Sequence, residues 1–203
     1  MKKGNDQHIN QDSGNAEYYT PSRFIESARL VMGNIDLDPA SCEIANRTVK
    51  ADRFFTKEDN GLAQEWAGRV WMNHPFHKGE LPCKKFKVKD KLGQYNCKKD
   101  ACKKRGYHID NEIPGNAQWI EKLINSYETG GILSAINICY ASTSEDWFKP
   151  LLEYPQCFIA KRVNYFDPEG KEVKGVTKGS VITFLGDDYL AFKREFSQYG
   201  KVK

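Results

Sequence analysis

The fold of this chain is read most directly from residues 70–76, whose sequence is VWMNHPF. The first three of these residues favour a buried β-strand, and Pro75 ends the strand because proline cannot donate a hydrogen bond to a ladder. The strand therefore leads into a segment that presents an amide, an imidazole, a rigid turn and an aromatic ring. In open α/β sheets, ligands bind at the carboxyl ends of the strands. We expect a binding site at residues 73–76, although Asn and Pro are also ordinary residues of a simple turn.

The rest of the sequence alternates between helix and strand patterns. A helix is expected after Thr20 as its N-cap and Pro21 as its first residue, and further helices are expected to be capped by Asn116 and Ser144. This alternation predicts an α/β fold with parallel, right-handed crossovers. The expected strands are residues 35–41, 54–55, 70–72, 132–140, 157–160 and 181–185, and a closing helix holds Leu190, Phe192 and Phe196.

Length and composition favour one domain, or one domain with a small insertion. The chain has 203 residues, of which 39% are hydrophobic, and this is enough for a core. No stretch approaches eighteen consecutive apolar residues, so no membrane span is expected. Residues 1–15 are polar, and we expect a disordered tail there and no secretory signal. A reducing, cytoplasmic location is therefore expected for the six cysteines.

The tetrapeptide Asn73-His74-Pro75-Phe76 resembles the Asn-Pro-Pro-Tyr/Phe signature of amino-group methyltransferases that use S-adenosylmethionine. Together with the preceding GRVWM, it is similar to the phage-type DNA N6-adenine methyltransferases, over roughly Tyr18 to Val202. The resemblance implies a Rossmann-like class I methyltransferase sheet with helices on both faces. The resemblance excludes residues 77–115, which composition marks as a Cys/Lys-rich, zinc-binding insertion in a methyltransferase domain of residues 16–203. It further implies a phage or prophage protein that marks DNA against restriction.

The chemistry of such a motif follows from the adenine amine. Its lone pair is delocalised into the ring, so the amine is a poor nucleophile. The Asn73 side-chain oxygen and the His74 carbonyl would each accept one N6–H and draw the nitrogen towards tetrahedral geometry, while Phe76 stacks on the base. The double-stranded DNA substrate would have to present its adenine flipped out of the helix.

One position departs from the family pattern. Members usually have proline where this sequence has His74, and histidine keeps the carbonyl but loses the ring constraint. Reduced activity or an altered substrate is therefore expected. The alternatives are a non-catalytic homologue that binds cofactor and DNA, and a methyltransferase whose amine belongs to cytosine N4, RNA or a protein amide.

Three further segments are expected to hold the cofactor, because they resemble the family's cofactor-binding stretches. The Tyr-Thr-Pro sequence stands before a predicted helix, whose free N–H groups suit a carboxylate. The Asp-Pro-Ala-Ser sequence follows a predicted strand, and Asp59 could accept from the cofactor's adenine amine or could instead form only an Asx-turn. With Asn73, the expected cofactor-binding residues are Tyr19, Thr20, Pro21, Asp38, Pro39, Ser41 and Asp59.

A lysine-rich stretch after Phe76 carries four potential metal ligands. Cys83, Cys97, Cys102 and His108 have the spacing Cys-x13-Cys-x4-Cys-x5-His, and three thiolates with one imidazole complete a tetrahedral zinc site. His74 and His77 are possible substitutes for His108. The stretch has almost no core-forming side chains, so bound metal would supply its folding energy. Cys139 and Cys157 lie in apolar strands and are read as core residues.

Charge is concentrated in the same stretch. From Cys83 to His108 the net charge is +8, whereas the whole chain carries +4, so the remainder is mildly acidic. Such a basic island favours a contact with nucleic-acid phosphates, although a solvated loop kept soluble by its charge is the plainer reading. The residues expected to contact DNA are Lys84, Lys85, Lys98, Lys99 and Arg162. Tyr165 is a possible helper, and for Arg162 and Tyr165 a role in the core or in a turn is equally open.

Overall fold

The computed structural model describes residues 18–84, 87–89, 95–97, 99–105, 108–167, 169–173, 176 and 178–203. The predicted disordered tail, residues 1–15, lies outside the described residues. The elements in chain order are α1 (Ser22–Met32), β1 (Leu37–Asp38), α2 (Glu43–Val49), β2 (Arg53–Phe54), η1 (Gly61–Ala63), β3 (Arg69–Met72), β4 (Lys87–Lys89), β5 (Tyr95–Cys97), α3 (Asp100–Arg105), α4 (Asn116–Glu128), β6 (Ser134–Tyr140), η2 (Lys149–Glu153), β7 (Gln156–Ile159), β8 (Ser180–Leu185), α5 (Tyr189–Phe196) and β9 (Gly200–Val202).

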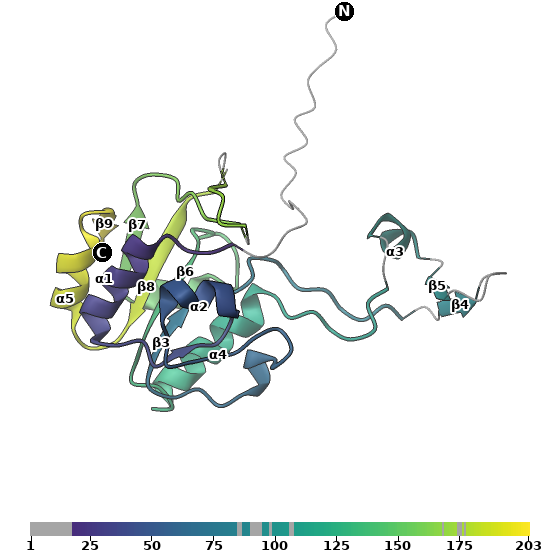
Figure 1. The fold of residues 1–203 in the computed structure, drawn as a ribbon, viewed down its shortest axis with the longest axis horizontal. Coiled ribbons are helices and arrows are strands. Elements are labelled where there is room, and N and C mark those ends of the chain that lie inside the picture. Colours follow the sequence, from purple (N-terminus) through teal and green to yellow (C-terminus); the bar gives the residue numbers. More distant parts are fainter. Residues whose placement is uncertain are drawn as a thin grey trace, which may run out of the picture.

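A seven-stranded mixed sheet forms the centre of the molecule (Figure 1). Its strand order is β2-β1-β3-β6-β8-β7-β9. The first four strands in this order are parallel to one another, whereas β8 is antiparallel to β6, and β7 and β9 continue with antiparallel pairing. The expected fully parallel sheet is therefore wrong for one half, because a hairpin-like return through β8 replaces a crossover there.

Helices cover both faces of this sheet, and the alternation of side chains along β3 shows how. Trp71 packs into the core under α1 and α5, together with Phe24 and Phe192. Val70 and Met72 point to the opposite face and pack under α4. Val70, Trp71 and Met72 are fully buried, whereas Arg69 at the start of β3 is half-buried, so most of the strand lies between two apolar layers. This placement confirms the predicted buried strand before the NHPF segment.

Several predicted boundaries change. Pro21, and not Thr20, flanks α1, and neither side chain caps the helix. Ser144 opens no α-helix, because residues 143–148 form turns that lead into the 3-10 helix η2. In the closing helix Leu190 is 74% exposed, whereas Phe192 and Phe196 are buried as expected. Strand β9 was not predicted, because three residues with one buried position carry no periodic signal.

The cysteine-rich segment (77–115) extends from the rest of the molecule as two antiparallel stretches of backbone, around residues 80–83 and 109–113, which hydrogen bonds join. We call these two stretches the stalk. Glu80 and Ile113 exchange both of their hydrogen bonds at 2.9 Å, and Cys83 N–H donates to the Ile109 carbonyl at 2.9 Å. At the base, Gly79 and Gly115 pack so closely that a side chain at Gly115 would overlap the Lys78 backbone. Figure 1 shows β4, β5 and α3 lying beyond this stalk, apart from the sheet.

Candidate active site

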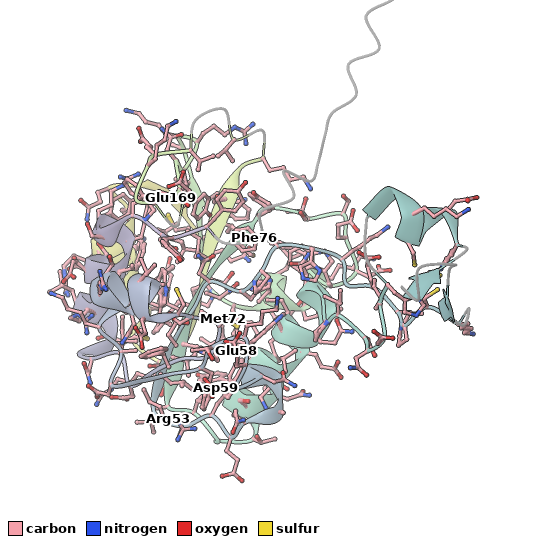
Figure 2. All side chains as sticks on the ribbon, turned by 45° about the vertical axis from the view of Figure 1, so that its right-hand side comes forward. Arg53, Glu58, Asp59, Met72, Phe76 and Glu169 are labelled. Carbon is pink, nitrogen blue, oxygen red and sulfur yellow. The ribbon has the colours of Figure 1, made fainter. Side chains whose placement is uncertain are left out.

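The carboxyl ends of β1 and β3 place two of the predicted segments at one edge of the sheet. Leu37 pairs with Val70 in parallel register, so Asp38, the last residue of β1, and Asn73, the first residue after β3, lie at the same edge of neighbouring strands. The segment 18–21 joins them from before α1. In the view of Figure 2, Phe76 and Asp59 lie to either side of Met72. The topology therefore gathers stretches that are far apart in the sequence, as expected for a site at the carboxyl edge.

Asn73 is half-exposed and its amide is oriented by the backbone. The Nδ2 group donates a hydrogen bond of 2.7 Å to the Tyr18 carbonyl oxygen. A carbonyl accepts only from the nitrogen, so this bond fixes which end of the amide is which. Within the described part of the chain, nothing donates to Asn73 Oδ1. This oxygen therefore remains available as an acceptor.

At His74 the side chain is buried, so the backbone carbonyl oxygen, and not the side chain, is the available acceptor. The ring is 1% exposed, and Nε2 lies 3.0 Å from Asn116 Oδ1. Asn137 Nδ2 lies 3.4 Å from His74 Nδ1 and also donates to the Met72 carbonyl at 3.1 Å. Among the described residues no donor reaches the His74 carbonyl oxygen. The substitution of His74 for His108 as a metal ligand is therefore excluded by its position in the core.

Burial also decides the charge of His74. Removal of the ring from water lowers the pKa of His74 to about 4, against a smaller opposite effect of the Asn116 hydrogen bond and a further lowering by His77. The ring is therefore neutral near pH 7, with the proton on Nε2 donated to Asn116 and Nδ1 accepting from Asn137.

Phe76 lies within a group of aromatic rings. Its ring centroid is 4.6 Å from that of Tyr140 and 6.0 Å from that of Tyr165. Tyr165 is buried and its hydroxyl pairs with Ser180 Oγ at 3.0 Å, so it is a core residue and not a helper in DNA binding. Phe76 and Tyr140 remain half-exposed. The edge of the sheet beside Asn73 is thus lined by aromatic surface.

The segment 18–21 is fastened to the site from two sides. Tyr19 exchanges backbone hydrogen bonds of 2.8 and 2.9 Å with Phe166, and its hydroxyl lies 3.2 Å from Cys42 Sγ, next to Ser41. Thr20 is buried, and its Oγ1 has no hydrogen-bond partner in the part of the chain that the structure describes. Pro21 is buried beside it. A buried hydroxyl without a partner indicates an acceptor or donor position for a ligand or an ordered water.

Asp38 is a buried carboxyl at the end of β1. It is 2% exposed, and Oδ1 accepts from the Ala40 N–H at 3.2 Å. Burial raises the pKa of Asp38 to about 7, while the Ser41 side chain and the Ala40 amide act in the opposite direction. A carboxyl group whose pKa is raised close to 7, at the carboxyl edge of a sheet, is typical of functional sites.

The turn that contains Asp59 packs on the Asp38 loop. A Cβ at Gly61 would overlap the Pro39 carbonyl oxygen, so only glycine permits this approach. Asp59 is exposed, and its Oδ2 accepts from the Thr56 N–H and hydroxyl, both at 2.8 Å. The Thr56 backbone N–H is the main cause of the lowered pKa of Asp59. The turn reading of Asp59 is therefore observed, and its second oxygen is left for another partner.

The four predicted metal ligands come together in the cysteine-rich segment. The ligand atoms of Cys83, Cys97, Cys102 and His108 all lie within 4.8 Å of one another. The Cys83 and Cys97 sulfurs are 3.6 Å apart, and about 3.8 Å is expected for two thiolates on one tetrahedral zinc ion. His108 Nδ1 is buried without a hydrogen-bond partner among the described residues. This cluster could hold a metal ion.

The pKa of Cys102 and the positions of the remaining cysteines and of His77 are consistent with a metal site at these four residues. Burial, followed by hydrogen bonds with Cys97 and Cys83, raises the pKa of Cys102, so a cation would have to displace protons from the sulfurs. His77, the other suggested substitute, accepts from the Gly79 N–H at 3.0 Å and is not in the cluster. Cys139 and Cys157 are fully buried core residues, as predicted.

The predicted DNA-contacting residues are only partly described. Lys84, Lys99 and Arg162 are exposed, whereas Lys85 and Lys98 lie outside the described residues. Lys84 and Lys99 line a cavity of about 500 Å³ with Lys78, between the stalk and the cluster. A second cavity of about 550 Å³ lies beside α4, and neither cavity includes Asn73. The site at Asn73 is therefore separate from both of these open cavities.

Sequence reasoning missed three residues of the site. Asn116 was expected to cap α4, but Gly115 takes the N-cap position and the Asn116 side chain faces His74. Asn137 stands in an apolar strand, where a lone buried amide was the available signal. Tyr140, at the end of β6, is the third. None of the helices in the described residues has the length and apolar character needed to span a membrane.

Comparison with protein families gives one match over nearly the whole chain. A family model described as DNA N-6-adenine-methyltransferase (Dam) matches residues 8–199. Searches among curated proteins and among solved structures gave no match.

Proposed function

The chain belongs to the DNA N-6-adenine-methyltransferase (Dam) family, and from this premise we propose that it transfers a methyl group from S-adenosylmethionine to the exocyclic amine of an adenine in double-stranded DNA. When bound, the cofactor would supply a methyl group on a sulfonium. The amine would attack this carbon as its bond to sulfur breaks, S-adenosylhomocysteine would leave, and the amine would release one proton. No covalent intermediate with the enzyme is needed. What the chain contributes is the position of the amine relative to that methyl group, and good orientation can lower a barrier by roughly 7–11 kcal/mol.

The observation that carries this proposal is the pair of unused acceptors at the end of β3. Asn73 Nδ2 donates to the Tyr18 carbonyl, and among the described residues neither Asn73 Oδ1 nor the carbonyl oxygen of the next residue, His74, has a donor. An amine with two N–H groups satisfies both oxygens at once. Each hydrogen bond draws electron density towards the nitrogen and aims its lone pair at the methyl donor. Asn73, His74, Pro75 and Phe76 form this catalytic segment.

Phe76 supplies the stacking surface for the base. Adenine inside a duplex cannot reach Asn73, so the nucleotide has to be flipped out. The half-exposed ring of Phe76, next to Tyr140, offers an apolar face to the extruded base. Stacking on an aromatic side chain compensates part of the cost of unstacking, which is a few kcal/mol.

The residues beside this edge fit the cofactor. S-adenosylmethionine carries a positively charged amino group and sulfonium, a carboxylate and an adenine ring. The buried Asp38 carboxyl suits a cation, and the unpartnered Thr20 hydroxyl offers a hydrogen bond within the same edge. Asp59 keeps one carboxylate oxygen for an amine. We assign cofactor binding to Tyr19, Thr20, Pro21, Asp38, Pro39, Ser41, Asp59 and Asn73.

In this proposal the sheet is a Rossmann-like methyltransferase sheet of residues 16–203, and the segment 77–115 is an insertion. The parallel half, β2-β1-β3-β6, carries the site at its carboxyl edge. The biological role that follows is modification of phage or prophage DNA against restriction in a bacterial cytoplasm.

The cysteine-rich segment would be held by a structural zinc ion. Three sulfurs and an imidazole satisfy a closed tetrahedral site, which has no open position for catalysis. His108 Nδ1 would be the fourth ligand, and Nε2 lies 3.7 Å from Asp110 Oδ1. With the ion in place, Lys84 and Lys99 stand at fixed positions on the cavity wall next to Lys78. Together with Lys85, Lys98 and Arg162, they would contact DNA phosphates.

The test is transfer of tritium from labelled S-adenosylmethionine to unmethylated DNA. The wild type should label DNA, and the labelled nucleoside should be N6-methyladenine by mass spectrometry. Asn73→Ala should abolish transfer and keep the thermal unfolding midpoint within a few degrees. Asn125→Ala, an exposed asparagine on α4, is the matched control and should retain full activity.

Other results would separate the alternatives. Cofactor binding without transfer to any DNA would indicate a non-catalytic homologue. N4-methylcytosine, or label on RNA or protein but not on DNA, would refute adenine as the target while keeping the methyltransferase reaction.

A further inference from the structure

The position of His74 raises a question that the motif alone leaves open. Proline at this place would hold the peptide through its ring, because φ is fixed near −65°. Histidine has no such ring, yet its carbonyl oxygen is one of the two proposed acceptors for the substrate amine. Some other part of the structure has to hold this peptide in place.

We propose that His74 is a positioning residue, whose buried side chain is locked by Asn116 and Asn137 so that its own carbonyl oxygen stays aimed at the amine. This inference rests on the proposed function. In this inference, hydrogen bonds of the imidazole hold the residue-74 peptide in place, as the covalent ring of proline would.

Two hydrogen bonds restrain the imidazole within its plane. Nε2–H donates to Asn116 Oδ1 at 3.0 Å, and Nδ1 accepts from Asn137 Nδ2 at 3.4 Å. Both bonds require the neutral ring with its proton on Nε2, and a protonated ring would have no acceptor for Asn137. Asn137 Nδ2 has two hydrogens and also reaches the Met72 and Ile138 carbonyls, at 3.1 and 3.3 Å, so its longer contact with Nδ1 is the weaker of the two restraints. The buried ring cannot flip or rotate without breaking the Nε2–H bond to Asn116.

Two aromatic rings lie next to the imidazole, one facing its plane and one at its edge. Trp119, from the first turns of α4, is nearly parallel to it, with a centroid distance of 6.4 Å and an angle of 28°. Phe76 meets it edge-on at 5.4 Å and 82°. The stacking residue of the motif and the positioning residue thus contact each other. A shift of the imidazole would displace both the His74 carbonyl and the Phe76 ring.

The lock also ties the motif to the base of the cysteine-rich segment. Asn116 is the first residue of α4, and its backbone N–H donates to the His77 carbonyl at 2.8 Å. One residue therefore holds the NHPF segment by its side chain and the start of the stalk by its backbone. Asn137 comes from β6, the neighbouring strand, and also holds the Met72 carbonyl at the end of β3.

The experiment is a double-mutant cycle between His74 and Asn116, measured as kcat and KM with S-adenosylmethionine and DNA. Loss of one buried hydrogen bond is worth about 1 kcal/mol, so Asn116→Ala should lower kcat about 5- to 10-fold. KM for both substrates should change less than about twofold, because the contact acts on the transition state. Asn116→Asp keeps an acceptor for Nε2–H but adds a charge that favours the protonated ring, so it should restore kcat only in part. Asn125→Ala is the control on the same helix.

The proline variant gives the decisive comparison. His74→Pro replaces the hydrogen-bond lock by a ring constraint, so Asn116→Ala should have little effect on kcat in that background. An equal loss in both backgrounds, or an Asn116→Ala variant with wild-type kcat, would overturn the inference. If the wild type transfers no methyl group, the proposed function is refuted and the inference falls with it.

A spectroscopic readout is independent of activity. In ¹⁵N-labelled protein the His74 imidazole should show the Nε2–H tautomer, and Asn116→Ala should give averaged nitrogen shifts. A wild-type ring that already exchanges between tautomers would refute the lock itself.

Discussion

Asp38→Asn is expected to stabilise the cofactor-free protein while weakening cofactor binding, because the two properties depend on the same buried charge. The side chain is 2% exposed, and burial raises the pKa of Asp38 from 3.8 to about 7. Asparagine has the same shape, keeps an oxygen for the Ala40 N–H and has no charge to bury. The substitution therefore removes the cost of ionisation and little else.

The size of this effect follows from linkage between protonation and folding. Between pH about 4 and 7 the folded chain keeps the Asp38 proton while the unfolded chain has released it, so stability falls as the pH rises through this window. One pKa unit corresponds to about 1.4 kcal/mol. The advantage of Asp38→Asn in the free energy of unfolding should thus grow by about 2–3 kcal/mol from pH 5 to pH 8, to at most about 4 kcal/mol.

Urea denaturation without cofactor, at pH 5 and at pH 8, measures this difference. Glu58→Gln removes an exposed carboxylate and serves as control, with an expected change within about 0.5 kcal/mol at both values. Saturating S-adenosylmethionine should then stabilise the wild type at pH 8 but not Asp38→Asn. If Asp38→Asn is less stable than the wild type at pH 8, or if its advantage does not grow with pH, the argument from burial is refuted.

Two further predictions concern the cysteine-rich segment. Metal analysis of the purified wild type should give about one zinc per chain, and Cys102→Ser should lose most of it while Cys139→Ala, in the core, keeps it; a wild type without zinc would defeat the metal site. Double substitution of Lys84 and Lys99 by alanine should reduce the slope of log K for DNA against log salt concentration by about 2, whereas the exposed pair Lys201 and Lys203 should leave it unchanged; equal slopes in all three proteins would leave the lysines of the segment with a role in solubility only.

The parts of this protein that could be predicted from the sequence are those determined by residues close to one another in the chain. The buried strand before Asn73 followed from three apolar residues and a proline. The helical stripe of α1, with Phe24, Ile25 and Ala28 buried and Gly33 at a φ of 84°, followed from periodicity and from the freedom of glycine. The four metal-ligand positions were predicted from residue type alone, because a lysine-rich stretch offers few other reasons for three cysteines and a histidine.

The antiparallel half of the sheet was not predictable in the same way. Strand β8 is fully buried and β6 is buried except at its two end residues, and such a run has the same pattern in parallel and antiparallel pairing. The direction of β8 depends on how the chain returns after β7, because β7 pairs with both β8 and β9 in antiparallel orientation. Propensity does not encode this choice, since it concerns elements far apart in the sequence.

At the site, the residue types establish which chemical groups are available, whereas the fold selects which of their atoms face the substrate. The sequence gives no sign that Asn73 Nδ2 is held by the Tyr18 carbonyl, 55 residues away, or that the His74 ring is buried against Asn116. Hydrogen bonds between distant residues form only after the sheet has brought their backbones together. The amide oxygen and the peptide oxygen that are left unused are therefore properties of the folded chain, although every residue that creates them is in the sequence.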